Sequence, residues 1–227
     1  MIGTLIVIDG IDGSGKATQA RLLHERLAKE GIAAEKIDFP RYNSQVYGEF
    51  LGECIAGKHG DFQHLDPKII STLFALDRFE ALDQIHEWFA QGKIVIADRF
   101  TSSNQIHQGG KIVDVEKRTK FLAWVDRVEH EVFGLPRPGA VIYLRVPVDT
   151  SMELLSKERE VKNQALEEAG ADLLEKDKMY LERSLESAEQ LSKNPDWHAI
   201  ECVVDGHMRS PESIHEDVYT IVSKMLA

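Results

Sequence analysis

A glycine-rich loop between a buried strand and a helix is the feature that most restricts what this chain can be. Residues 10–16 read Gly-Ile-Asp-Gly-Ser-Gly-Lys and match the spacing Gly-x-x-x-x-Gly-Lys of a phosphate-binding loop. The apolar run Leu5–Ile8 precedes the loop, and apolar residues at helical spacing follow it. Glycines let backbone N–H groups approach an anion, and a helix N-terminus adds partial positive charge. The loop therefore predicts a site for the phosphates of a nucleotide.

We expect ATP at this loop, with the amine of Lys16 on its β- and γ-phosphates. The position after the lysine usually carries a hydroxyl that binds Mg²⁺, but here it is Ala17, and Thr18 follows. Magnesium must then be held partly by water, by the nucleotide and by carboxylates, and the candidate carboxylates are Asp9 and Asp98. The residues predicted to bind ATP are Gly10, Asp12, Gly13, Ser14, Gly15, Lys16, Ala17 and Thr18.

Five apolar runs alternate with helical patterns along the chain, which predicts an α/β fold: one domain, residues 1–227, with a doubly wound, five-stranded parallel sheet covered by helices on both faces. A long helix is expected from Pro67 to about Gln91, because Asp66-Pro67 is typical of a helix start. In such folds ligands bind beyond the carboxyl ends of the strands. The expected strands are 5–8, 36–39, 93–97, 140–144 and 199–204.

Composition excludes several classes of protein. With 43% hydrophobic residues the chain can bury a core, so disorder is excluded as its main state. A net charge of −11 opposes binding to nucleic acid or to an anionic membrane, so an anionic substrate must be small and held by local cations. Cys54 and Cys202 fit no disulfide framework and no metal motif, and no apolar stretch is long enough to span a membrane. We expect a cytoplasmic protein.

A second strand ends in Asp98-Arg99, which is how proteins with a phosphate-binding loop place a carboxylate near the metal. Taken alone, these two residues also fit a simple ion pair at the end of a strand. Beside a phosphate-binding loop, we expect both in the site.

Four segments together resemble the thymidylate kinase family, whose members phosphorylate dTMP with ATP. The resemblance extends over nearly the whole chain and implies the fold of nucleotide kinases with a phosphate-binding loop and a helical lid. The segments are residues 9–18, Phe39-Pro40-Arg41, residues 73–78 (Leu-Phe-Ala-Leu-Asp-Arg) and residues 98–104 (Asp-Arg-Phe-Thr-Ser-Ser-Asn).

The resemblance also implies how dTMP is bound. Arg41 would bind its 5′-phosphate, Phe74 would stack on thymine, and Arg78 and Asn104 would read the edge of the base. Asp12 also fits a turn residue, and Phe74 also fits a core aromatic. The substrate-binding residues implied are Asp12, Phe39, Arg41, Phe74, Arg78, Arg99 and Asn104, with His107 and Gln108 against the sugar.

For catalysis the resemblance implies Lys16, Arg99, Asp98 and a cation of the lid, about residues 157–175. The lid is poor in arginine and Arg159 is its best candidate, although a solvated run of charges is the alternative. A homodimer is typical of the family. Two other functions stay open: another nucleotide or deoxynucleoside kinase of this fold, and a nucleotide-dependent switch or binding module. The chain lacks the Asn-Lys-x-Asp signature of GTPase switches, and a nucleoside kinase would not need Arg41.

Overall fold

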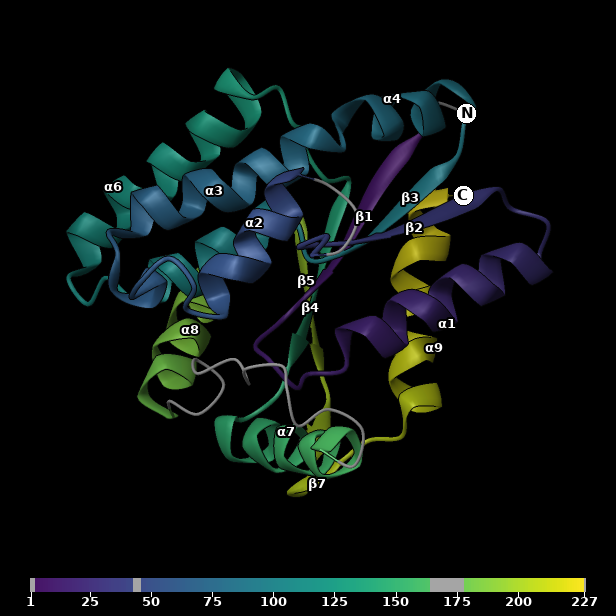
Figure 1. The fold of residues 1–227 in the computed structure, drawn as a ribbon. Helices are drawn as coiled ribbons and strands as arrows, with labels where there is room; N and C mark the ends of the chain where they lie inside the picture. Colours follow the sequence, from purple (N-terminus) through teal and green to yellow (C-terminus); the bar gives the residue numbers. More distant parts are fainter. Residues whose placement is uncertain (1–2, 43–45, 164–177, 227) are drawn as a thin grey trace.

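A five-stranded parallel sheet forms the centre of a computed structural model that describes residues 3–42, 46–163 and 178–226 (Figure 1). The strand order is β2-β3-β1-β4-β5, and every neighbouring pair is parallel. This confirms the predicted doubly wound sheet. The strands are β1 (Thr4–Asp9), β2 (Ala34–Asp38), β3 (Ile94–Asp98), β4 (Ala140–Arg145) and β5 (Trp197–Glu201).

Side chains of the central strand β1 alternate between the two faces, and both faces are buried. Ile6 and Ile8 pack against α1 (Lys16–Lys29) and α9 (Pro211–Leu226). Leu5 and Val7 contribute to the core on the opposite face, which α4 covers. Burial on both faces explains why the strand reads as a continuous apolar run.

The helix expected over residues 67–91 is two helices, so that prediction was wrong in its continuity. α3 (Pro67–Glu80) and α4 (Leu82–Ala90) meet at Ala81, whose N–H donates to the carbonyl of Arg78 at 3.1 Å. Ala81 is fully buried in the core on the face of the sheet that α4 covers. Alanine is the best helix former, so no local signal marks this break.

The last predicted strand also ends earlier than expected. β5 stops at Glu201, and β6 (Val203–Val204) pairs antiparallel with β7 (His207–Met208) in a small separate hairpin. The remaining described elements are α2 (Val46–Ile55), η1 (Phe62–His64), α5 (Thr101–Ser103), η2 (Asn104–Gln108), α6 (Val115–Asp126), η3 (Arg127–Val132), α7 (Val148–Asn163) and α8 (Lys178–Leu191).

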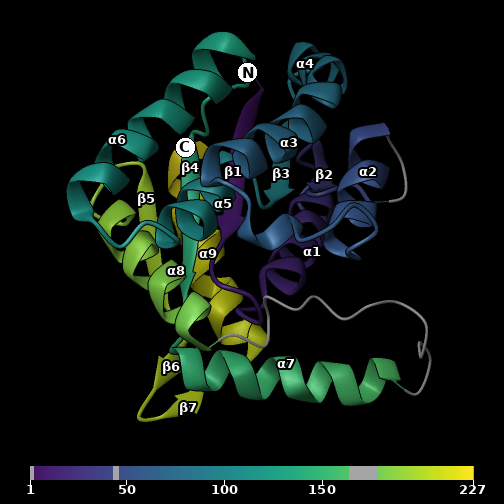
Figure 2. The same ribbon diagram turned by 60° about the vertical axis from the view of Figure 1, so that its left-hand side comes forward.

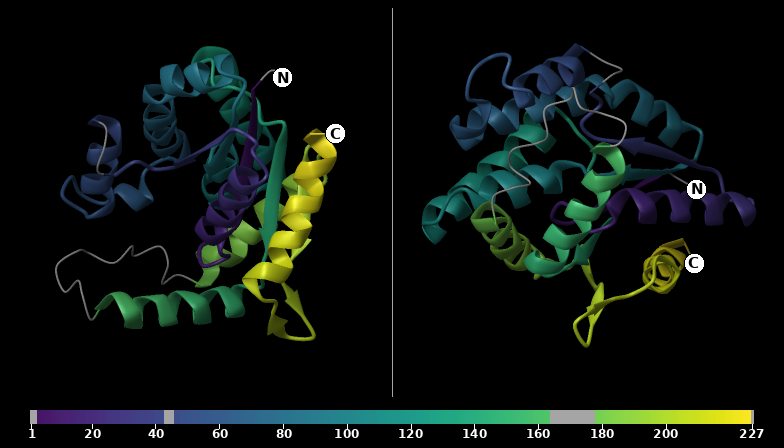
Figure 3. Two further views of the ribbon diagram at one scale, coloured as in Figure 1. Left: turned by 90° about the vertical axis from the view of Figure 1, so that its right-hand side faces the viewer. Right: turned by 60° about the horizontal axis from the view of Figure 1, so that its bottom comes forward.

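α7 lies beyond the carboxyl ends of the strands (Figures 2 and 3). The start of β1 and the end of α9 lie at the opposite end of the sheet (Figure 3). Among the described residues, none of the helices has the length and apolar character needed to cross a membrane.

α8 packs closely on the π-helical segment η2 (Figure 2). Two glycines after η2 make this approach possible, since a Cβ on Gly110 would lie 2.8 Å from the carbonyl oxygen of Arg183 and one on Gly109 would lie 2.8 Å from Ser187 Oγ. Ser187 Oγ also donates to the carbonyl of Gln105 at 2.8 Å. The two glycines therefore set the distance between α8 and η2.

We predict that Gly110→Ala destabilises the protein by about 1–3 kcal/mol, because the new methyl group meets backbone atoms of α8 that cannot rotate away. Gly52→Ala in α2 is the matched control, since its Cβ would meet Tyr42 only at ordinary contact distances of 3.5 Å and more. Urea unfolding of the two variants measures the difference. Equal stability of both variants would contradict the close packing of α8.

Candidate active site

The candidate site lies where β1 and β3 end side by side. Ile8 is the register partner of Asp98, so the loop after β1 begins next to Arg99. The N–H of Arg99 donates to the carbonyl of Ile8 at 3.1 Å and fixes the two strand ends together. The phosphate-binding loop and the Asp98-Arg99 pair, separate in sequence, thus share one end of the sheet.

In the phosphate-binding loop, the amine of Lys16 is folded over its own backbone. Lys16 Nζ donates to the carbonyls of Gly10 at 3.2 Å and Ile11 at 2.8 Å. Burial and the charge of Arg99 lower the pKa of Lys16 to about 8, although Asp12 opposes the shift. The N–H groups of residues 15–18 donate no hydrogen bond to any described residue. These N–H groups and the amine of Lys16 together provide the donors and the positive charge that suit a phosphate.

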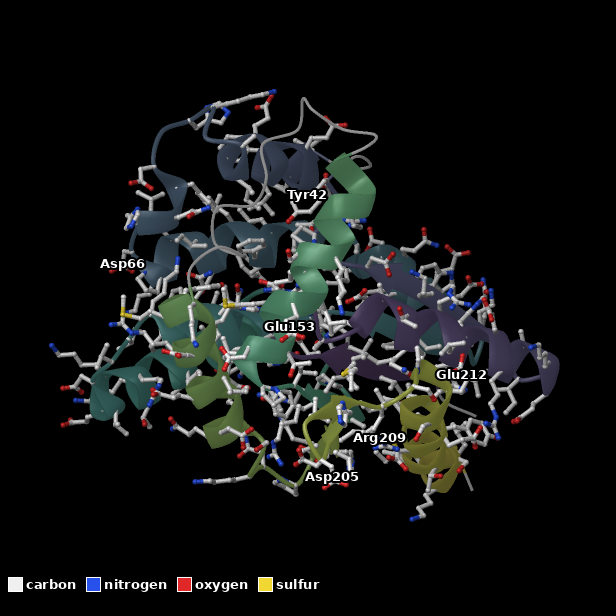
Figure 4. The ribbon with its side chains drawn as sticks, turned by 90° about the horizontal axis from the view of Figure 1, so that it is seen from below. Tyr42, Asp66, Glu153, Asp205, Arg209 and Glu212 are labelled. Atoms are coloured by element: carbon white, nitrogen blue, oxygen red, sulfur yellow. The ribbon has the colours of Figure 1, made fainter. Side chains whose placement is uncertain are left out.

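α7 begins directly against this loop. Ser151 Oγ donates to the carbonyl of Asp12, and Gly13 leaves room for Ser151 and Leu155, because a Cβ there would lie 2.8 Å from the carbonyl oxygen of Ser151. From below, α7 is seen to run across this end of the molecule with Glu153 on its course (Figure 4). Arg159 lies on α7 two turns beyond Ser151, but its side chain and lid residues 164–175 lie outside the described part.

Asp12 and Arg99 form an ion pair at the centre of the site. Burial is the largest influence on the pKa of Asp12 and raises it, but the neighbouring positive charges, with Arg99 first among them, and the hydrogen bond from Arg99 together outweigh burial and hold that pKa well below its usual range. Arg99 has φ of 66°, in the left-handed region that non-glycine residues seldom occupy. Arg99 is one of the predicted site residues, and rarely populated backbone conformations of this kind are typical of functional positions.

The two acidic candidates for magnesium differ in how they are held. Asp9 is fully buried and accepts from Ser102 Oγ at 2.5 Å, Ser103 Oγ at 2.9 Å and the N–H of Gly10. The carboxylate of Asp98 is partly exposed and has no hydrogen bond to the described residues, and burial raises its pKa. Among the residues that the structure describes, no three or more His, Cys, Asp or Glu side chains form a group that could hold a metal ion. Asp98 is therefore suited to be one ligand of a Mg²⁺ ion whose other ligands are water and nucleotide oxygens.

A cavity that opens to solvent lies beside the loop. The wall combines aromatic and aliphatic side chains with a few polar groups at one end. The lining residues are Asp12, Phe39, Pro40, Tyr42, Ile55, Phe62, Gln63, Ile70, Phe74, Arg78, Arg99, Ser103, Asn104, His107, Gln108, Lys111 and Tyr180.

A buried ion pair forms one wall of this cavity. Arg78 donates from Nε and Nη2 to Glu129 at 2.8 Å each, and both side chains are almost fully buried. Asn104 Nδ2 donates to Glu129 at 2.7 Å and to the carbonyl of Ser71 at 3.0 Å. These bonds use the Asn104 amide protons, while Arg78 Nη1 and Asn104 Oδ1 have no hydrogen bond to the described residues.

Three further predicted residues also lie on this cavity. Phe74 is half-buried and packs on Phe62, with ring centroids 6.3 Å apart. Phe39 is buried with its ring edge-on to Phe100. Gln108 is 3% exposed, and its Oε1 has no hydrogen-bond partner among the described residues, so it is an acceptor available to a ligand.

Arg41 does not line the cavity. Its guanidinium donates from Nε to the Asp77 carboxylate at 3.2 Å and from Nη2 to the Asp77 carbonyl at 2.7 Å. Its N–H donates to the other oxygen of the same carboxylate at 3.0 Å. Arg41 thus lies between two lining residues in sequence, Pro40 and Tyr42, and is held by an acidic residue of α3.

Comparison with known proteins agrees with this geometry. The thymidylate kinase family model matches residues 8–204. The chain belongs to the thymidylate kinase family. It is similar to the thymidylate kinase of Mycobacterium tuberculosis, 33% identical over 66% of this chain and 69% of that protein. It is also similar to the human thymidylate kinase, 28% identical over 95% of this chain and 88% of the relative.

The structure adds residues to this thymidylate kinase site that sequence reasoning missed. Glu129 holds two of the predicted base-reading residues, yet it is 25 residues from Asn104 and 51 from Arg78. Tyr180 lines the cavity from α8. Neither residue lies in a motif. Ser102 and Ser103, by contrast, come two residues after Asp98-Arg99, and their hydroxyls near a strand end were a usable signal.

We predict that Glu129→Gln lowers the free energy of unfolding by about 3–5 kcal/mol, because it leaves the Arg78 cation buried without its counter-charge. Glu189→Gln is the matched control. Glu189 also forms a two-bond pair with an arginine, Arg145, but both side chains are about one-third exposed, so the expected loss is under about 1 kcal/mol. Urea unfolding distinguishes them, and similar losses would contradict a buried, charged pair.

Proposed function

We infer that this chain is an ATP-dependent phosphotransferase that converts dTMP to dTDP. The observation that carries this inference is the junction of two sites: the phosphate-binding loop and the cavity meet at Asp12 and Arg99. A donor phosphate on the loop and the phosphate of an acceptor nucleotide in the cavity would then lie on either side of one guanidinium. Family membership gives the same reaction.

We propose that the base is read by those hydrogen-bonding atoms of Arg78 and Asn104 that do not bond to Glu129. Arg78 Nη1 is a donor and Asn104 Oδ1 an acceptor on one wall. Thymine presents a carbonyl and an adjacent N3–H, which match a donor and an acceptor in that order. Cytosine presents an amino group and an unprotonated N3, the reverse order. Phe74, with its ring on the cavity, supports stacking on the base.

For phosphoryl transfer, the protein has to align the reactants and neutralise charge. Lys16, Arg99 and Arg159 on α7 are the cations we assign to this task, with Asp98 near the metal. Magnesium, when bound with ATP, neutralises charge on the donor phosphates. No general base is needed, because the second pKa of the acceptor phosphate is about 6 and its oxygen is already ionised.

We assign the acceptor phosphate to Arg41. Its position in sequence between two residues that line the cavity, Pro40 and Tyr42, and its planar, two-bond donor geometry support the assignment. Asp77 holds the guanidinium there but leaves Nη1 without a hydrogen bond to the described residues. Burial raises the pKa of Asp77, while its bonds from Arg41 oppose that shift. Arg41 would therefore bind the acceptor phosphate and also hydrogen-bond the buried carboxyl group of Asp77.

We also propose a homodimer that acts in the cytoplasm. Exposed apolar side chains on α3, α6 and η3 support the dimer: Ile69, Phe79, Val115 and Val132 are each between 45% and 66% exposed. α3 and α6 lie side by side, so a partner could cover both helices (Figures 1 and 2). Cys54 and Cys202 are buried and free, in keeping with a reducing compartment.

The activity is tested by coupled ADP release with ATP and a panel of acceptors. We expect dTMP to accelerate release strongly, dCMP, AMP and GMP to accelerate it far less, and thymidine not at all. Lys16→Ala is the control for contaminating kinases and should lower kcat by at least 100-fold. Turnover of thymidine would indicate a nucleoside kinase, and no response to any acceptor would indicate a switch or binding module.

Arg41→Ala should raise the KM for dTMP by about 10- to 100-fold, since one charged contact to a phosphate is worth about 1.4–2.8 kcal/mol, and leave the KM for ATP nearly unchanged. Arg137→Ala is the control, because Arg137 is exposed and pairs only with Asp126 among the described residues. Urea unfolding is measured in parallel, because the variant also removes the partner of Asp77. An unchanged KM for dTMP in a folded variant would refute the assignment.

A further inference from the structure

Tyr180, the third residue of α8, lies directly against His107 of η2. The two rings are stacked, with centroids 5.8 Å apart and an angle of 17° between their planes. The Tyr180 hydroxyl is 3.0 Å from Nδ1 of His107. The close approach of α8 to η2, set by Gly109 and Gly110, brings the two residues together.

The other nitrogen of His107 faces Arg99. Nε2 lies 3.0 Å from Arg99 Nη1. A guanidinium only donates hydrogen bonds, so Nε2 must accept and cannot carry a proton. The single proton of a neutral imidazole is then on Nδ1, which donates to the oxygen of Tyr180. The contacts therefore define one tautomer of His107.

The surroundings of His107 agree with a neutral ring. His107 is 7% exposed, and burial lowers its pKa to about 4. A ring protonated on both nitrogens would place two donors and two positive charges face to face at 3.0 Å. The neutral ring instead accepts a bond from Arg99, on the same guanidinium that pairs with Asp12 through Nη2.

We propose that Tyr180 is a positioning residue for phosphoryl transfer: it holds His107 in the tautomer that accepts from Arg99, and so holds Arg99 in place beside Asp12. The proposal rests on the proposed function, because Arg99 is the cation assigned to the phosphates. Tyr180 acts through His107, and its own contact with the reacting atoms is not required. The order of the chain of contacts is Tyr180, His107, Arg99, Asp12.

The test is a double-mutant cycle with Tyr180→Phe and His107→Gln. Tyr180→Phe keeps the ring and its stacking but removes the acceptor for Nδ1–H. We expect kcat to fall by about 3- to 30-fold, with a smaller change in the KM for dTMP. In a His107→Gln background the same change should have less than a 2-fold effect. Tyr219→Phe is the matched control, since Tyr219 bonds Glu30 on the far side of the sheet, and kcat should not change.

A second readout does not depend on turnover. In ¹⁵N-histidine-labelled protein, long-range proton–nitrogen spectra should show His107, assigned by its loss in His107→Gln, with a protonated Nδ1 and a bare Nε2. Tyr180→Phe should shift this ring toward the Nε2–H tautomer. The proposal is overturned if the wild-type ring carries its proton on Nε2, or if Tyr180→Phe costs as much without His107 as with it. Wild-type turnover of dTMP separately tests the proposed function.

Discussion

The parallel pairing of β1 with β3 is the constraint on which the rest of the structure depends. With Ile8 opposite Asp98, two loops that are more than 80 residues apart in sequence begin at the same level of the sheet. The anion-binding backbone of one loop then lies beside the cation of the other, and β4 on the other side of β1 leads into α7, which packs on the same loop. A shift of one residue in this pairing would turn the strand side chains to the wrong face and separate these groups.

The site carries its charges in pairs of one arginine and one carboxylate. Asp12 holds Arg99, Asp77 holds Arg41, and Glu129 holds Arg78. Each guanidinium keeps part of its donor capacity while its carboxylate fixes its position. Because oriented charges need little reorganisation when a phosphate binds, such pairing suits a reaction that depends on alignment and electrostatics. The same pairs explain how a chain of net charge −11 can bind two anionic nucleotides.

Features that depend on local sequence could be predicted, and features that depend on long-range packing could not. The phosphate-binding loop, the buried strands and the Asp98-Arg99 ending follow from residues next to one another, and the cavity contains Phe74, Arg78, Asn104 and Gln108 as the family resemblance implied. The break at Ala81 leaves no trace in sequence, because alanine favours the helix that is interrupted there. Glu129 reads as one acid among many on a helix, and only the fold carries it beneath Arg78. The binding and catalytic roles assigned to all of these site residues, and to Arg41 and Arg159, stay predictions.

The resting place of Lys16 links nucleotide binding to protons. Its buried amine donates to two carbonyls of its own loop, and its pKa is about 8. Incoming phosphates bring negative charge next to this amine and favour its protonated form. Above about pH 8, association with the donor is therefore accompanied by uptake of a hydrogen ion, and its affinity declines as the solution becomes more alkaline. The lysine that supplies positive charge to the phosphates thus also makes the affinity for the nucleotide depend on pH.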